Sequence, residues 1–139
     1  LAAMLVFFMQ PGFALCEAVQ SRFGARRGAL AVGVLWGLWH LPLNLFFYSP
    51  DTSLQSIASQ LVVCVTLGVF FTFAYEKCGK NIWIPVLLHY LNNNMILVWT
   101  GTADISNQII GWGDVAAAAV LYAIVFLPFL AAKCFKKAE

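Results

Sequence analysis

The sequence predicts an all-α fold, a polytopic bundle of transmembrane helices with about four full spans and a partial one at the N-terminus. Of its 139 residues, 62% are hydrophobic and only 10% are charged, whereas soluble globular domains hold roughly 45 to 50% apolar and about 25% charged residues. The apolar residues also gather in runs of roughly 18 to 20, the length that crosses a bilayer. We therefore expect membrane lipids around the chain and no nucleic acid partner.

Four apolar runs are long enough to be full spans, and they cover residues 30–47, 57–75, 82–99 and 115–132. Pro42 lies in the first run and leaves the Leu38 carbonyl without its helical partner, so it can supply a buried acceptor or a local kink, or be only a tolerated bend. An apolar segment over residues 1–15 precedes them without a basic region, so we interpret it as the end of a truncated helix rather than a signal peptide. Spans joined by short loops leave no room for a separate soluble domain, which predicts one membrane-embedded domain over residues 1–139.

The basic residues predict how the spans are oriented. All eight lysines and arginines lie in three polar segments, at residues 17–28, 76–81 and 133–139, and none lies in the loops at 48–56 and 100–114. Cytoplasmic loops collect Lys and Arg. The three basic segments, including the C-terminus, are therefore expected on the cytoplasmic side, and the short loops favour a bacterial plasma membrane.

Two histidines and an asparagine are expected at similar depth in the membrane. At about 1.5 Å per residue, His40 lies roughly 15 Å along its span, while His89 and Asn93 lie about 10 and 16 Å along theirs. Ionisable groups at this depth are costly and usually serve transport or chemistry. His89 and Asn93 are four residues apart and share a helix face, as do His40 and Asn44. The polar faces would meet inside the bundle, either as a site or as a structural hydrogen-bonded helix pair.

The residues around these positions resemble a known family. Trp36 and His40 in VLWGLWHLPLN match a motif F/W-x-x-x-H, and His89 and Asn93 in IWIPVLLHYLNNN match H-x-x-x-N. Both motifs are similar to those of the CPBP or ABI intramembrane proteases, which include the type II CAAX prenyl endopeptidases. The similarity covers residues 12–94.

This resemblance implies an endopeptidase that hydrolyses a peptide bond in a membrane-associated or prenylated protein through attack by water. It further implies that His40 and His89 hold water or a divalent metal such as zinc, and that Asn93 stabilises the oxyanion. Trp36 would wall the site, although packing is the ordinary role of such a tryptophan. Two imidazoles and an amide make an incomplete zinc site, and no helical H-E-x-x-H is present.

One motif of the family is missing. A sequence E-E-x-x-x-R is expected immediately before Gly12, where this chain has VFFMQPG over residues 6–12. The resemblance assigns that glutamate the activation of water, and a general base contributes about 10² to 10⁴ in rate. Glu17 and Glu76 are the remaining candidates, but both are predicted in cytoplasmic loops roughly 10 Å or more from the histidines.

Two other functions therefore stay open. The chain could be a catalytically inactive relative that binds membrane partners, which the missing glutamates favour. It could also be a b-type cytochrome with His40 and His89 as axial haem ligands. The neighbouring Trp, Pro and Asn residues favour the protease family over the cytochrome.

Overall fold

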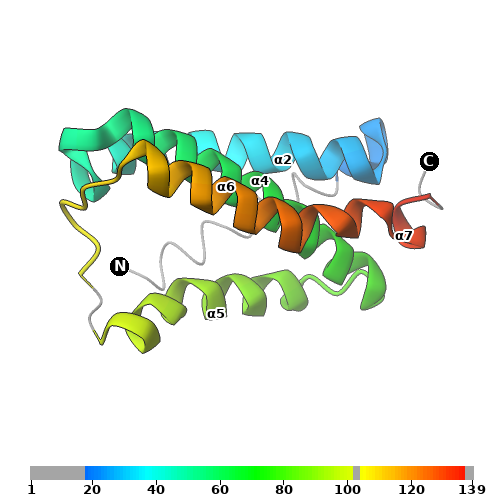
Figure 1. Cartoon of the computed structure of the whole chain (residues 1–139). Helices are drawn as coiled ribbons and strands as arrows, with labels where there is room; N and C mark the ends of the chain where they lie inside the picture. The colour runs from blue at the N-terminus through cyan, green and yellow to red at the C-terminus, as the bar shows by residue number, and fades with distance from the viewer. Residues whose placement is uncertain (1–17, 102–103, 137–139) are drawn as a thin grey trace.

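The structure is a computed structural model, and it describes residues 18–101 and 104–136 (Figure 1). These residues form helices and contain no strand, so the predicted all-α fold is confirmed for them. The elements are α2 (Ala25–Trp39), α3 (Leu41–Leu43), a π-helix η1 (Asn44–Tyr48), a 3-10 helix η2 (Pro50–Thr52), α4 (Ser53–Lys77), α5 (Trp83–Thr100), α6 (Trp112–Phe126), a 3-10 helix η3 (Leu127–Ala131) and α7 (Lys133–Lys136). The partial span expected over residues 1–15 lies outside this range.

Three helical segments in the described part of the chain are long and apolar enough to cross a membrane. They run over Ala25–Tyr48, Pro50–Lys77 and Trp112–Ala131. The fourth expected span forms a helix, α5, of 18 residues, but His89 and three consecutive asparagines lie in it and it is not among the three. The chain is an all-α integral membrane protein, and α5, the long helix outside these three, carries His89 and Asn93.

One predicted loop is wrong, and the last predicted span is helical to Ala131 but changes its type of helix before that end. Residues 18–23 are helical, and α2 starts at Ala25 after Gly24, whose φ of 81° interrupts the helix. Arginine and alanine are good helix formers, so the arginine-rich segment predicted as a loop is largely helical. The last predicted span ends as α-helix at Phe126 and continues as the 3-10 helix η3, because Pro128 lacks the N–H that an α-helix needs.

Helix α4 is the centre of the bundle, since α2, α5, α6, η3 and α7 all contact it. Figure 1 shows α2, α4 and α6 lying together, with α5 running below them. The start of α2, the turn between α4 and α5, and α7 are all at one end of the molecule (Figure 1). The described parts of the three basic segments therefore share one end of the bundle.

At this basic end the chain is held together by a small core and by polar contacts. Phe135 of α7 is fully buried against Ala25, Ala29 and Val69. The guanidinium Nε of Arg26 donates to the carbonyl oxygen of Leu130 at 3.2 Å. The C-terminal segment is thereby fixed to the beginning of α2.

The opposite end is closed by the loop that precedes α6. The backbone N–H groups of Asn107 and Gln108 donate to the carbonyls of Phe47 and Tyr48, at 3.1 and 2.6 Å. The N–H of Ile110 donates to the Thr52 hydroxyl at 3.0 Å. These bonds satisfy polar groups in the connection between η1 and α4.

Helices α2 and α4 touch backbone to backbone where Gly33 meets α4. A Cβ added at Gly33 would lie 2.6 Å from the Cα of Val65 and 3.1 Å from the carbonyl oxygen of Cys64. On the α4 side, a Cβ added at Gly68 would lie 3.3 Å from the Cα of Gly33. Small residues allow such close packing in membranes, where van der Waals contact is a main force between helices. Gly33 therefore sets the separation of the two helices.

Replacing Gly33 tests this packing. Gly33→Ala should lower the free energy of unfolding by about 1 to 3 kcal/mol, because the new methyl group meets backbone that cannot give way without moving a helix. Thermal unfolding in detergent measures the loss. Gly113→Ala is the matched control, since nothing lies within 4 Å of a Cβ at Gly113. Equal stability of the two variants would contradict the assigned contact.

Candidate active site

His40 lies at the break between α2 and α3. Its φ and ψ are −81° and −1°, and its N–H bonds to the carbonyl of Gly37 at 3.1 Å, one residue short of the α-helical partner. Pro42 follows at the start of α3, and because it has no N–H it cannot bond the carbonyl of Leu38 four residues earlier, which promotes a break here. Of the outcomes considered for Pro42, the structure has an interruption of the α-helix, and it falls at the histidine itself.

The tightened turn frees a carbonyl for the imidazole. In a regular helix the N–H of His40 would bond the carbonyl of Trp36; here that oxygen lies 2.8 Å from Nδ1 of the His40 ring. A carbonyl oxygen only accepts, so Nδ1 carries the proton. The neutral ring therefore presents an unprotonated Nε2, a hydrogen-bond acceptor.

His89 and Asn93 form a pair on α5, as the four-residue spacing predicts. The Asn93 Nδ2 lies 2.7 Å from the His89 Nε2. With the amide as donor, Nε2 accepts and the neutral ring carries its proton on Nδ1. His89 is 5% exposed, while Asn93 is exposed. The pair thus joins a buried imidazole to an amide at the surface.

Trp36 lies against both histidines. Its ring centroid is 6.1 Å from that of His40 and 5.1 Å from that of His89. Phe71 of α4 packs against the other side of the group, with centroids 5.8 Å from Trp36 and 6.2 Å from His89. Three helices thereby bring the two histidines to one aromatic wall. The role of Trp36 as a site wall fits this geometry, and the catalytic roles remain predictions.

One polar atom of this group has no partner. The His89 Nδ1 is buried, and no hydrogen-bond partner contacts it within the described residues. An unsatisfied buried donor costs about 1 to 3 kcal/mol. A water molecule or an oxygen of a bound molecule would remove this cost, so Nδ1 marks a place where a ligand atom would bind.

The two carboxylates considered from the sequence do not join this group. Glu17 lies outside the described residues. Glu76 is near the end of α4, where its carboxylate is 3.9 Å from the ammonium of Lys80. It follows Phe71 by five residues, about 7.5 Å along the helix axis. Glu76 therefore sits at the basic end rather than beside His89.

The residues present do not fit a zinc site. No three His, Cys, Asp or Glu side chains gather anywhere in residues 18–101 and 104–136. A catalytic zinc takes three protein ligands, whereas this site offers two imidazoles, and one nitrogen of each is already hydrogen-bonded. The proposed ligands His40 and His89 need a third donor that these residues do not supply.

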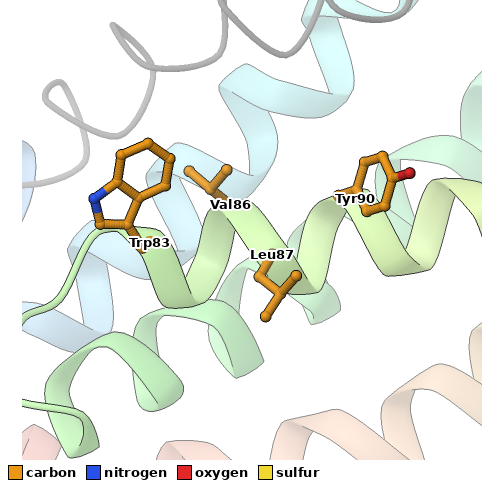
Figure 2. Close-up of a pocket in the computed structure, with 4 residues that line it drawn as sticks. All are labelled: Trp83, Val86, Leu87 and Tyr90. Carbon is orange, nitrogen blue, oxygen red and sulfur yellow. The ribbon is translucent and has the colours of Figure 1, made fainter.

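An open apolar pocket of about 350 Å³ lies along α5, lined by Trp83, Val86, Leu87 and Tyr90 (Figure 2). Figure 2 shows the side chains of Trp83, Val86 and Tyr90 pointing to one side of the helix. Asn93 follows Tyr90 by three residues, about one turn along the same helix. Trp83, Leu87 and Tyr90 are all more than half exposed.

Sequence reasoning missed two contributors to this site. Phe71 lies inside a continuous apolar run that gives no sign of which residues face α2. Ser56 was placed in a loop, although it is buried in the first turn of α4. Its hydroxyl donates to the Asn44 side chain at 2.7 Å. The spacing of His40 and Asn44 was the one signal that pointed toward this contact.

The fold and site define a class, an all-α membrane protein with two histidines and an asparagine gathered among its helices. The profile of the type II CAAX prenyl endopeptidase Rce1-like family matches residues 7–95. The chain belongs to this family. It is 28% identical over 114 residues to the CAAX prenyl protease 2 of Methanococcus maripaludis. The aligned region covers 76% of this chain and 41% of that protein. The chain thus spans less than half of this relative, and it matches no solved structure.

Phe71 can be tested for its place in the wall. Phe71→Ala should lower the free energy of unfolding by about 3 to 5 kcal/mol, because it removes a buried ring that packs against Trp36 and His89. The measurement is thermal unfolding in detergent. Phe46→Ala serves as control, since Phe46 is 80% exposed and should change stability by less than about 0.5 kcal/mol. Unchanged thermal stability of Phe71→Ala would argue against the packing of Phe71 on Trp36 and His89.

Proposed function

We propose that this protein is an intramembrane endopeptidase that hydrolyses a peptide bond near the C-terminus of a prenylated protein. The observation that carries the proposal is the meeting of His40 and His89 at Trp36, with Asn93 bound to His89. These residues match the two family motifs found in the sequence. Membership of the Rce1-like family supports the reaction class.

In this proposal His40 is the base. Its unprotonated Nε2 accepts a proton from water as the water oxygen attacks the scissile carbonyl, and it later returns that proton to the leaving amine. The Asn93 amide carries two N–H groups, of which one bonds His89 and the second donates to the oxyanion. The buried Nδ1–H of His89 binds an oxygen of the substrate or water. No step requires a metal.

The apolar pocket on α5 is the proposed site for the prenyl chain. It is open and lined by apolar side chains, and Asn93 follows Tyr90 by about one turn of the same helix. A prenyl group dissolved in the bilayer would enter it from the side of the helix. The gathering of the basic segments at one end supports a cytoplasmic location for that end and for the C-terminus, and the short loops favour a bacterial plasma membrane.

A second candidate function rests on a different observation. Residues 6–11 read VFFMQP where the family has E-E-x-x-x-R, so the glutamate that the resemblance assigns to water activation is absent there. A chain without this base would bind a prenylated or other membrane partner and leave it uncleaved.

Cleavage of a quenched prenylated CAAX peptide by the full chain in detergent separates the two functions. The peptidase proposal expects cleavage by the native chain and a loss of roughly 10² to 10⁴ in kcat/KM for His40→Ala and for His89→Ala. Phe46→Ala, altered at an exposed position, should keep full activity. If the native chain does not cleave the peptide and the Val6→Glu/Phe7→Glu variant does, the non-catalytic function would be established instead. Silence of both would refute the peptidase proposal.

Replacing Trp83 tests the prenyl pocket. Trp83→Ala should raise KM for the prenylated peptide about tenfold with kcat unchanged, because the loss of about 1.4 kcal/mol of apolar contact weakens ground-state and transition-state binding alike. Michaelis–Menten kinetics on prenylated and unmodified peptides provide the measurement. Trp112→Ala, which alters an exposed tryptophan of α6, is the matched control. An equal rise in KM for the unmodified peptide would exclude the prenyl pocket.

A further inference from the structure

Beyond the residues that would touch substrate, a buried polar relay reaches His40 from α4. The Ser56 hydroxyl donates to the Asn44 Oδ1 at 2.7 Å, and the Asn44 Nδ2 donates to the carbonyl oxygen of His40 at 3.0 Å. Asn44 is 1% exposed and Ser56 is 4% exposed. The hydrogen bonds of these two residues reach the backbone carbonyl of His40 and not its ring, so the relay acts on the ring through the backbone.

These hydrogen bonds act where the α-helix is interrupted at His40. His40 ends α2, and its N–H bonds Gly37 in a tightened turn. The carbonyl of His40 accepts two bonds, both from Asn44, one from the backbone N–H at 3.0 Å and one from the side chain at 3.0 Å. Asn44 also begins the π-helix η1, a form that often accompanies functional sites. Asn44 therefore fixes the backbone on which the imidazole stands.

Fixing this backbone has a consequence for the ring. The bond between the His40 Nδ1 and the Trp36 carbonyl at 2.8 Å forms only while the turn at His40 keeps its shape. A turn that relaxes toward a regular helix would return the Trp36 carbonyl to the His40 N–H. The ring would then lose the acceptor that keeps its proton on Nδ1.

We propose that Asn44 and Ser56 are positioning residues that hold His40 in the Nδ1–H tautomer with Nε2 free to accept a proton. For catalysis this inference rests on the proposed function, in which Nε2 of His40 is the base. The effect on the tautomer itself does not depend on catalysis, so it can be tested in an inactive chain.

Two kinds of variant isolate the relay. Ser56→Ala removes the hydroxyl that orients Asn44, whereas Ser56→Thr keeps a hydroxyl and should restore the native behaviour. Asn44→Asp keeps the acceptor for Ser56 but removes the donor to the His40 carbonyl. Ser59→Ala, three residues along the same helix, is the matched control.

Nitrogen NMR of the full chain in detergent, labelled with ¹⁵N in histidine, gives the direct readout at one fixed pH. The chain has two histidines, so His89 serves as an internal reference. We expect the Nδ1–H tautomer for His40 in the native, Ser56→Thr and Ser59→Ala chains. Ser56→Ala and Asn44→Asp should show a mixture of tautomers at His40 with unchanged His89 signals. Unchanged His40 signals, or equal changes at both histidines, would overturn the proposal.

Kinetics on the prenylated peptide provide the second readout. Ser56→Ala should lower kcat roughly 10- to 100-fold with KM unchanged, as a misplaced catalytic group does. A tautomer change in an uncleaving chain would refute the peptidase function and leave the positioning role standing. A tautomer change without loss of kcat in an active chain would show that His40 is not the base.

Discussion

The contact between the backbones of α2 and α4 at Gly33 is the constraint on which the rest of this structure depends. Apolar side chains gain little by leaving lipid for protein, so close packing has to hold the helices together. Gly33 and Gly68 bring the two helix axes near enough for Trp36, three residues after Gly33, to lie against Phe71, three residues after Gly68. His89 of α5 completes this aromatic group. The geometry of the site thus follows from two positions that lack a side chain.

A second constraint is that a break in a membrane helix must satisfy its own polar groups, because the bilayer core offers no water. The break at His40 does so locally. The Trp36 carbonyl accepts from the His40 ring, and the His40 carbonyl accepts twice from Asn44. The bonds that repair the break are therefore the same bonds that set the proton position on the imidazole. The same hydrogen bonds satisfy the backbone carbonyls at the break and orient the His40 ring.

The sequence predicted those parts of the structure that depend on regular helices. The His89–Asn93 pair was expected because both residues lie on one uninterrupted helix, and α5 starts and ends within a residue of its predicted bounds. The relation of Asn44 to His40 was expected as a shared face. Asn44 instead bonds the His40 backbone, because α2 stops at His40 and a π-helix begins at Asn44.

Other features could not have been predicted. The apolar run of α4 carries no periodic polar mark, so nothing in it shows that Phe71 and Gly68 face α2. Ser56 was taken as part of a loop, because Pro50 and Asp51 are turn residues and the helix was expected to begin after them. Helix α4 starts at Ser53, and that early start places the Ser56 hydroxyl beside Asn44.

The two histidines differ in the proton each presents, and this difference bears on the missing glutamates. His40 gives its Nδ1–H to Trp36 and presents an acceptor, Nε2. The Nε2 of His89 accepts a hydrogen bond from the Asn93 amide, so His89 presents a donor, Nδ1–H. A site that takes a proton from water and stabilises a developing negative charge needs one acceptor and at least one donor. In the function proposed above, the imidazole pair supplies both without a carboxylate, and Nε2 of His40 is the base in a chain whose sequence lacks E-E-x-x-x-R before Gly12.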